Sequence, residues 1–376
     1  MTKKTAMFPL FQLEPAYITI FQGAILYFTF IISTVDIFVP SITAAVAGRD
    51  SWISAIVTVI LASPVALTII TLALRFPRRS FIEYSQMVLG VWAGRLVGLL
   101  YLFLILVIGA TTARELEEIM SIAFFTHTPQ VIFGIIGVGL SAYLVWNGLE
   151  VIGRVNGILL PVGLLLLLFV AAAVLPGAKL DQYLPILEYG YGPPARGAII
   201  LMAYLLEGFI LIYILPLIRQ PHQVLKAFTI TLPLLGLALL TGTVSIPVFG
   251  LEATSRLLMP AIELAREIQI PGLPRSDILI MLGWYAGILV RIAVAHYLLA
   301  LLTAQWAGLR NYKPLVLPFG VIIVALSQLM FNNTGEVIQF IGNSLVYTLL
   351  FFEFVIPFFI LVISWVRNIE EKGGVS

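Results

Sequence analysis

Four ionisable residues fall inside long apolar stretches of this chain: Asp36, Glu207, Arg291 and Glu353. A charge at the centre of a lipid bilayer costs at least about 2.5–3.5 kcal/mol, so such residues usually pair with one another or line a cavity. Here three acids accompany a single base. Even when Arg291 neutralises Asp36 or Glu207, two acids lack a fixed counter-ion, so a proton or a cationic group on a ligand must offset them.

Asp36 and Glu207 are the stronger candidates for a binding site. Asp36 lies in the apolar stretch 17–46, four residues before Pro40, whose missing N–H leaves the Asp36 carbonyl without its helical partner. Glu207 is followed by Gly208, and glycine permits irregular backbone. Such backbone is tolerated at membrane depth only where protein or water surrounds it. We therefore expect a break at residues 33–37 and another near Glu207. We expect the ligand cavity to be lined by Ser33, Thr34, Asp36, Tyr204, Glu207, Gly208 and Tyr285.

Arg291 and Glu353 also have a purely structural interpretation. Arg291, paired with Asp36 or Glu207, can serve simply to hold helices in register. Glu353 lies four residues before Pro357 and can hydrogen-bond across a kink in the last apolar stretch. The sequence leaves both interpretations open beside the functional one.

The remaining polar residues predict neither catalysis nor metal binding. Glu115, Glu117 and Glu118 follow the third apolar stretch, and we expect them to form a solvated extension of its helix. The chain has no cysteine, which excludes thiolate nucleophiles and sulfur metal sites, and its three histidines are scattered. No nucleophile and base stand at a recognisable spacing. We therefore expect no enzymatic activity, no catalytic residues, no metal and no cofactor.

Membrane helices must position these residues. The chain has 376 residues, of which 60% are hydrophobic and 11% charged, whereas soluble proteins carry about 25% charged residues. The alternating pattern of an outer-membrane barrel is absent. We predict an all-α integral membrane protein that forms a single polytopic domain over residues 1–376. The ten expected spans are 17–46, 52–74, 97–113, 129–146, 156–175, 198–218, 227–250, 278–303, 314–331 and 337–366.

The distribution of basic residues predicts the orientation of these spans. With the N-terminus in the cytoplasm, thirteen of the 21 lysines and arginines lie inside and seven outside. We therefore expect both termini in the cytoplasm, together with the loops 75–96, 147–155, 219–226 and 304–313.

Two segments are neither spans nor simple loops. Residues 78–96 mix basic and apolar positions and should lie along the cytoplasmic face. Residues 256–269 place apolar side chains on one helical face, which is typical of an interfacial helix. This second segment is either a solvated connector or a lid over an outer cavity.

The two halves of the chain, about 11–176 and 197–366, share a pattern. The first span of each carries an acid, Asp36 or Glu207, and a later proline, Pro40 or Pro216. Five plus five spans, with an interruption in the first of each half, is the pattern of inverted-repeat transporters.

Five stretches resemble the spore germination permease family. They are GRDSWIS (48–54), FIEYSQMVLGVWAGRLVG (81–98), TP (128–129), GLEVIGRVNGILLPV (148–162) and NYKPLVLPFGVIIVALSQ (311–328). That family supplies the B subunit of germinant receptors in endospore-forming bacteria. It belongs to the amino acid–polyamine–organocation (APC) superfamily of transporters, and the resemblance covers nearly the whole chain.

The resemblance implies ten helices in a 5+5 inverted-repeat, APC/LeuT-like fold, with a small amino-acid-like ligand between broken helices 1 and 6. It further implies a place in the spore inner membrane or bacterial cell membrane. The implied partners are the A and C subunits of a germinant receptor, with no nucleic acid. Superfamily members often hold a ligand carboxylate at a glycine-rich break in helix 1. Here Ser33, Thr34, Val35 and Asp36 occupy that place, and an acid there repels a carboxylate unless it is protonated or paired.

Two functions are therefore open. A receptor subunit would bind the solute and pass a signal to its partners. A proton-coupled amino acid or amine transporter of the same superfamily would use the same pocket and cycle a proton on Asp36 or Glu207. In the superfamily's arrangement span 8 packs beside span 1, where sodium-coupled relatives bind an ion. The Arg291 guanidinium would take the place of that cation.

Overall fold

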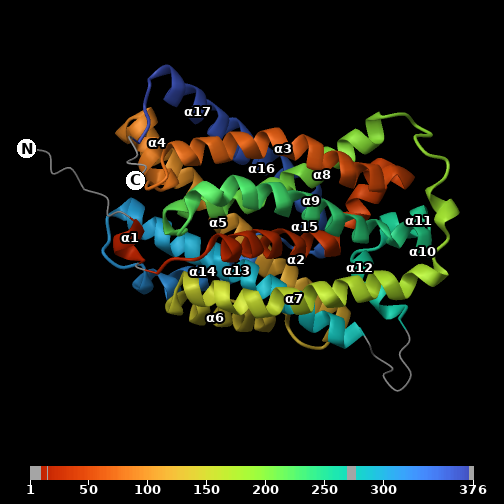
Figure 1. Cartoon of the computed structure of the whole chain (residues 1–376). Helices are drawn as coiled ribbons and strands as arrows, with labels where there is room; N and C mark the ends of the chain where they lie inside the picture. The colour runs from red at the N-terminus through yellow and green to blue at the C-terminus, as the bar shows by residue number, and fades with distance from the viewer. Residues whose placement is uncertain (1–9, 15, 269–276, 372–376) are drawn as a thin grey trace, which may run out of the picture.

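Helices make up the regular structure of the described chain (Figure 1). The computed structural model describes residues 10–14, 16–268 and 277–371, and in these ranges it contains no β-strand, only an isolated bridge between Ile18 and Ile218. The α-helices are α1 (Leu10–Leu13), α2 (Ile20–Ala47), α3 (Ser51–Arg75), α4 (Phe81–Leu89), α5 (Val91–Glu118), α6 (Gln130–Asn147), α7 (Leu149–Val174), α8 (Gly192–Glu207), α9 (Val224–Thr243), α10 (Ser245–Phe249), α11 (Leu251–Arg256), α12 (Pro260–Arg266), α13 (Asp277–Ala307), α14 (Lys313–Leu329), α15 (Thr334–Gln339), α16 (Val346–Leu350) and α17 (Ile356–Val366).

Shorter helices of other types join or continue these elements. The 3₁₀ helices are η1 (Gly48–Asp50), η3 (Leu175–Gly177), η4 (Leu180–Tyr183), η5 (Gly208–Leu217) and η6 (Pro221–Gln223). The π-helices are η2 (Ile119–Phe124), η7 (Phe340–Leu345) and η8 (Phe351–Val355). Two of the π-helices interrupt the last apolar run, which is therefore α15, η7, α16, η8 and α17 in succession.

Eight helical runs of the described residues are long and apolar enough to cross a membrane. One of them, Ile20–Arg75, contains both α2 and α3, joined through η1, and α14 is a shorter apolar helix. The long helices lie side by side in Figure 1, with α1 and α4 at one end of the bundle and α10 to α12 at the other. The chain is thus a multi-pass, all-helical membrane protein.

Helix α2 is the centre of the bundle. It begins at a capping box, in which Thr19 accepts from the Gln22 N–H and the Gln22 side chain accepts from the Thr19 N–H. Every residue from Leu26 to Ala44 is buried. The helices packed around it are α7, α8, α9 and α13. The first apolar stretch of the sequence is therefore the element on which the others are assembled.

The predicted break at residues 33–37 is wrong, because α2 is one continuous helix from Ile20 to Ala47 with Pro40 inside it. A proline removes one backbone hydrogen bond, and neighbouring hydroxyl groups can satisfy nearby carbonyls in a membrane helix. Here Ser41 Oγ donates to the Phe38 carbonyl at 3.0 Å and Thr43 Oγ1 donates to the Val39 carbonyl at 3.1 Å. These bonds add to the hydrogen bonds beside the proline, although the Asp36 carbonyl that lost its donor is not one of their acceptors.

The sixth apolar stretch changes its helix type near Glu207, where a break was predicted. Helix α8 ends at Glu207, and Gly208 begins the 3₁₀ helix η5. Within η5 the backbone of Ile214 leaves helical geometry, at φ −107° and ψ 19°. A 3₁₀ segment of this length is unusual, because its hydrogen bonds are poorer than those of an α-helix. The acid at position 207 thus sits at a change of backbone geometry deep in the protein.

The two segments expected to lie off the spans contain short helices at opposite ends of the bundle (Figure 1). Helix α4 falls within residues 78–96. Helix α12 falls within residues 256–269, of which residue 269 lies outside the described chain. The residues Ala261, Ile262 and Leu264 of α12 are buried, and α12 packs against α2 and α13. This burial argues against a solvated connector and favours a cover over this end of α2.

Candidate functional site

A buried ion pair joins Arg291 to Glu207. The Nη2 atom of Arg291 on α13 lies 2.7 Å from Oε1 of Glu207, the last residue of α8, and the two side chains are 3% and 0% exposed. Of the two partners that the sequence offered, the structure selects Glu207. Removing water from both charges is costly, so such a pair is stable only when further hydrogen bonds satisfy the remaining polar atoms.

The other nitrogens of Arg291 have such bonds, whereas Oε2 of Glu207 has no hydrogen-bond partner among the described residues. Nε donates to Thr112 Oγ1 on α5 at 3.0 Å, and Nη1 donates to the Phe30 carbonyl on α2. The guanidinium carbon also lies 4.7 Å from the centre of the Phe30 ring, a cation–π contact. One arginine therefore ties α13 to α8, α5 and α2 at a single point.

Asp36 does not pair with Arg291. It lies six residues beyond Phe30, and at about 100° per residue its side chain leaves α2 on another face. There Thr241 on α9 donates to Asp36 Oδ1 at 3.2 Å. Among the described residues no ion pair involves Asp36, although it is only 3% exposed. The proposed Asp36–Arg291 pair is thus not formed.

Asp36 and Ser33 instead line a small cavity on the side of α2 that faces α7 and α13. Its volume is about 50 Å³, and Trp284 and Gly283 of α13 form part of the opposite wall. The Ser33 hydroxyl is buried and has no hydrogen-bond partner. A cavity of this volume holds a few water molecules and no more. A buried acid and an unsatisfied hydroxyl therefore face the same enclosed space.

The other predicted lining residues lie elsewhere, so the structure divides the predicted site in two. Tyr204 is buried, and its hydroxyl donates to the Ile341 carbonyl in η7 at 2.7 Å. Gly208 packs on the ring of Tyr27, and Tyr285 is half-buried; neither lines the cavity beside Asp36. Thr34 is buried next to the carboxyl group of Glu115.

Glu115 is a functional candidate that the sequence interpretation missed. It was expected to be solvated with Glu117 and Glu118, but all three are buried, at 3%, 0% and 0% exposure. Glu115 interacts electrostatically with both Arg291 and Glu207, and one of its oxygens lacks a hydrogen-bond partner. The Arg291 guanidinium thus has two carboxyl groups near it, those of Glu207 and Glu115, while Asp36 lies apart from them beside Thr241.

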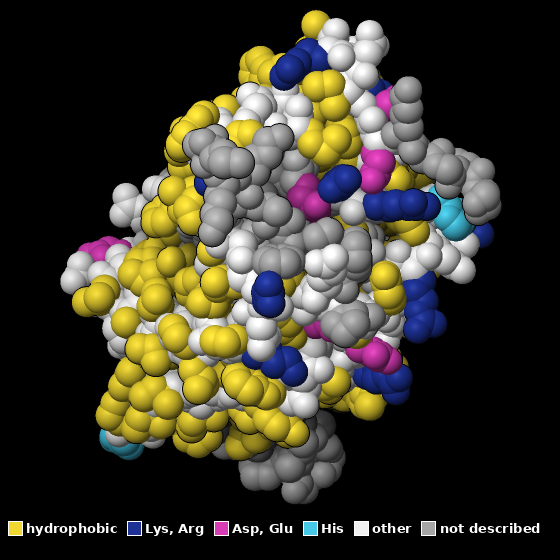
Figure 2. All heavy atoms as spheres, turned by 90° about the vertical axis from the view of Figure 1, so that its left-hand side faces the viewer, with side chains coloured by type: hydrophobic (Ala, Val, Ile, Leu, Met, Phe, Trp, Pro, Cys, Tyr) yellow, Lys and Arg dark blue, Asp and Glu magenta, His cyan; other side chains and the backbone are white. Residues whose placement is uncertain are grey.

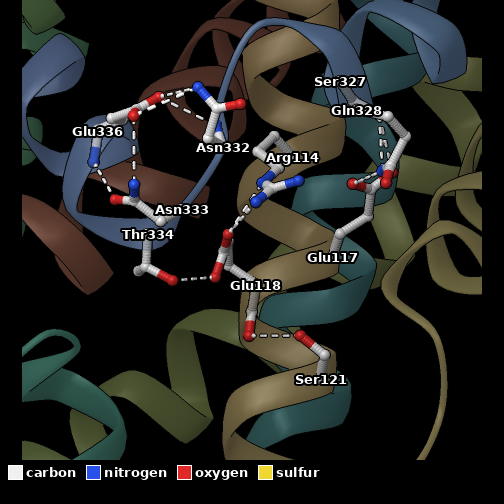
Figure 3. A network of polar contacts seen from close by, with 10 residues as sticks. All are labelled: Arg114, Glu117, Glu118, Ser121, Ser327, Gln328, Asn332, Asn333, Thr334 and Glu336. Carbon is white, nitrogen blue, oxygen red and sulfur yellow. Dashed lines mark hydrogen bonds and ion pairs between the residues drawn. The ribbon is translucent and has the colours of Figure 1, made fainter.

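Glu117 and Glu118 belong to a separate network at the end of α5 (Figure 3). Arg114 forms an ion pair with Glu118 at 2.7 Å, and Glu118 also accepts a hydrogen bond from Thr334 at the start of α15. Glu117 accepts from Ser327 Oγ on α14 at 2.8 Å. These acids therefore connect α5 to α14 and α15. The i,i+4 spacing of Arg114 and Glu118 is the one signal in the sequence that could have indicated the pairing.

Glu353 is fully buried in η8, and Tyr213 of η5 donates to both of its oxygens at 3.1 Å. This hydrogen bond joins the last apolar run to the sixth one, so it is not the expected bond across a kink within the last run. In the described part of the chain, no three histidine, aspartate or glutamate residues gather as metal ligands would.

Over nearly its whole length the chain is similar to proteins of spore germination. A family model described as spore germination protein matches residues 17–335. The spore germination protein YndE of Bacillus subtilis is 24% identical over 362 residues, which cover 94% of this chain and 98% of YndE. Spore germination protein KB of the same organism is 24% identical over 373 residues, covering 96% and 98% of the two chains.

Two solved structures share the fold. A Na⁺-coupled sialic acid symporter in a substrate-bound, outward-open state superposes with a TM-score of 0.60 at 12% identity, over 94% of this chain and 82% of the symporter. Mhp1, a nucleobase-cation-symport-1 family transporter in a closed conformation, superposes with a TM-score of 0.57 at 17% identity, over 98% of this chain and 82% of Mhp1.

Proposed function

The chain belongs to the family of spore germination proteins, and we propose that it is the membrane subunit of a germinant receptor. In this role it binds a small amino-acid-like germinant and passes the signal to the A and C subunits. It acts as a binding protein and not as an enzyme, without metal or cofactor. In this proposal the chain crosses the membrane ten times, in two halves of inverted topology. Both of its termini lie in the cytoplasm.

The observation that carries this proposal is the cavity shared by Asp36 and Ser33. Glu207 already has a cationic partner in Arg291, whereas Asp36 has only the Thr241 hydroxyl. An ammonium group on the ligand would supply the missing positive charge, and Ser33 Oγ would supply a further hydrogen bond. Trp284, on the wall opposite, offers an aromatic surface to the same cation.

The size of the cavity connects binding to signalling. At about 50 Å³ it cannot hold an amino acid, so helices must separate for the ligand to enter. The α7 and α13 walls are the elements that would move, and α12 covers one end of α2 and α13. Occupancy would then favour one arrangement of these helices over another, which partner subunits at the membrane surface could sense.

A proton-coupled amino acid or amine transporter is the alternative. The fold is that of two transporters, and the single guanidinium of Arg291 stands near two carboxyl groups, Glu207 and Glu115, with Asp36 outside that group, so a proton has carboxyl groups to occupy. Arg291 fixes a positive charge between α13 and α2, and we propose that neither function requires sodium. A transporter would open the cavity alternately to both sides of the membrane, which a receptor does not need.

The test is the response of spores that carry Asp36→Asn. We expect the germinant concentration for half-maximal germination to rise at least about tenfold, with unchanged amounts of the protein in the spore membrane. Asp181→Asn, the same substitution at an exposed position in η4, is the matched control and should respond as wild type. A normal response from Asp36→Asn spores would exclude Asp36 from the germinant site.

A further inference from the structure

A second hollow lies on the flank of the bundle, between α2, α7 and α9. This lateral cleft has a volume of about 370 Å³. It is lined by Ile20, Phe21, Ala24, Ile25, Phe28, Leu160, Leu164, Gln223, Lys226, Ala227, Ile230, Thr231 and Leu234. The lining side chains Phe21, Ile230 and Leu234 are 67%, 55% and 49% exposed, so the cleft opens sideways toward lipid. An apolar hollow at this depth is filled by hydrocarbon in a membrane.

The polar groups of the lateral cleft lie at one end of it. Gln223 and Lys226 lie at the start of α9. The hydroxyl of Thr231, which lies deeper, donates to the Ala227 carbonyl at 2.8 Å. Lys226 is exposed and forms no ion pair among the described residues, and no acid lines the cleft. An amphiphile in the cleft would therefore meet positive charge at one end and hydrocarbon along the rest.

A second basic residue stands close to the same end. The N–H of Arg219 donates to the Ile18 carbonyl at 3.0 Å, and Ile18 precedes the cleft residue Ile20 by two positions in the chain. Arg219 is exposed, and no ion pair involves it in the described part of the chain. Two exposed cations that form no ion pair among the described residues therefore lie at this end: Lys226 in the lining of the cleft, and Arg219 in the segment bonded to Ile18. Basic pockets between membrane helices are typical sites for anionic lipid head groups.

The depth of the lateral cleft matches a single leaflet. From Lys226 to Leu234 the α9 axis advances about 12 Å at 1.5 Å per residue. Half of a hydrocarbon core of about 30 Å is about 15 Å. An acyl chain anchored by its head group at Lys226 would therefore reach to Leu234 without crossing the bilayer midplane.

We propose that the lateral cleft binds one anionic phospholipid. An acyl chain lies along Phe28, Leu164 and Ile230, and the phosphate rests between Lys226 and Arg219. The lateral cleft and the Asp36 cavity have Leu160 and Leu164 in common, but the lipid site does not depend on whether the chain senses or transports its solute. It requires only that the chain spans a membrane.

The lateral cleft adjoins a second cavity that reaches the start of η5. A smaller apolar cavity of about 70 Å³ shares Ile20, Ala24, Ala227 and Thr231 with the lateral cleft. It extends inward to Tyr27 and Gly208, where α8 changes to η5. A bound acyl chain in the lateral cleft would therefore lie beside the cavity that reaches the irregular part of the sixth span.

Native mass spectrometry of the purified full chain tests the proposal. The protein is equilibrated in micelles with equal amounts of phosphatidylglycerol and phosphatidylcholine, and retained lipid is counted. We expect one retained phosphatidylglycerol, at least about fivefold preferred over phosphatidylcholine. Lys226→Gln should reduce this preference at least about fivefold, whereas Lys313→Gln, at the start of α14, should not. Ala227→Leu should displace the acyl chain, whereas Ala172→Leu on the exposed face of α7 should leave binding intact.

Three results would overturn the proposal. One is equal retention of the two lipids by the wild-type protein. This result can be obtained even if a variant fails to fold. The second is unchanged phosphatidylglycerol binding in Lys226→Gln. The third is retention of added palmitate in place of phospholipid, which would assign the cleft to a free fatty acid.

Discussion

Arg291 is the residue on which the centre of the protein depends. Its guanidinium bonds to Glu207, Thr112 and the Phe30 carbonyl, which belong to three different helices. Breaking a buried ion pair leaves an uncompensated charge, which costs about 3–5 kcal/mol. A carboxylate left alone at this point would have neither water nor a cation to stabilise it.

We predict that Arg291→Ala lowers the free energy of unfolding by about 3–5 kcal/mol, because it strands Glu207. Adding Glu207→Gln should restore part of the loss, since the amide carries no charge. Adding Asp36→Asn should restore none of it, because Thr241 and not Arg291 contacts Asp36. Chemical denaturation in mixed micelles provides the measurement.

The matched control is an exposed pair of the same type. Arg154 and Glu150 lie 2.6 Å apart, but their side chains are 72% and 39% exposed. Arg154→Ala should change stability by no more than about 1 kcal/mol. Recovery of Arg291→Ala by Asp36→Asn, with none from Glu207→Gln, would show that the pairing described here is wrong.

At this scale the sequence located the buried charges but not all of their neighbours. Asp36, Glu207, Arg291 and Glu353 were identifiable because each interrupts an apolar run. Glu115 was not, because acids at the end of an apolar run resemble a solvated helix end. Its burial depends on helices that pack around α5 from distant parts of the chain, and no local pattern carries that information.

The junction between α8 and η5 is the element that sets the site apart from an ordinary membrane helix. Gly208 permits α2 to approach it closely: a Cβ atom there would lie 2.5 Å from the Tyr27 ring and 3.0 Å from Ile31. The hydroxyl of Tyr27 meanwhile donates to the Leu205 carbonyl at 2.9 Å, just before the junction. The two spans are thus in contact where the backbone geometry changes.

We predict that Gly208→Ala destabilises the protein by about 1–3 kcal/mol, because the added methyl group overpacks the contact with Tyr27. Gly139→Ala on α6 is the control, since no atom lies within 4 Å of the position its Cβ would take. Thermal unfolding in detergent should show a lower midpoint for Gly208→Ala only. Equal midpoints for the two variants would contradict the close approach of α2 and η5.

The sequence predicted where helices end better than it predicted whether a helix is interrupted. Apolar runs and glycines marked the ends of most helices, and Glu207 with Gly208 marked the end of α8. The break in α2 was inferred from Pro40 and its polar neighbours, and it is absent. Whether proline breaks a helix depends on its surroundings. In α2 the residues around Pro40 are all buried, and Ser41 and Thr43 donate to the Phe38 and Val39 carbonyls beside it.

At the scale of the whole molecule, the end of the bundle that holds α1 and α4 bears on the orientation of the chain in the membrane. The end with α1 and α4, shown in Figure 2, carries arginine and lysine side chains between apolar surfaces. The C-terminal segment closes on it: the Glu371 N–H donates to the Arg75 carbonyl at 3.0 Å, and its side chain lies 3.5 Å from Arg79. Basic residues accumulate at cytoplasmic ends of membrane proteins, so this end should face the cytoplasm.

Single cysteines can test that orientation, because the natural chain has none. We predict that Arg79→Cys, in a side chain 44% exposed, reacts with a membrane-impermeant maleimide only after cells are opened. Arg256→Cys, at a side chain 78% exposed at the other end, should react in intact cells. The reverse pattern of labelling would invert the topology.

The overall class of fold could be predicted from composition and span lengths, since a chain this apolar can only be a helical membrane protein. The arrangement of the spans could not be predicted from the residues alone. It depends on close approaches such as that of Gly242 on α9 to Pro40, where a Cβ would come within 2.8 Å. Contacts of this kind join positions far apart in the sequence and leave no local signal.

Binding and uptake by the purified chain test the central claim most directly. The protein is reconstituted into liposomes, and equilibrium binding and uptake of a panel of radiolabelled L-amino acids are measured in the same preparation. We predict saturable binding of at least one amino acid, weakened at least about tenfold by Asp36→Asn, with uptake no greater than in empty liposomes. Saturable uptake by the wild-type protein, or binding that Asp36→Asn leaves unchanged, would contradict a receptor that holds its ligand at Asp36.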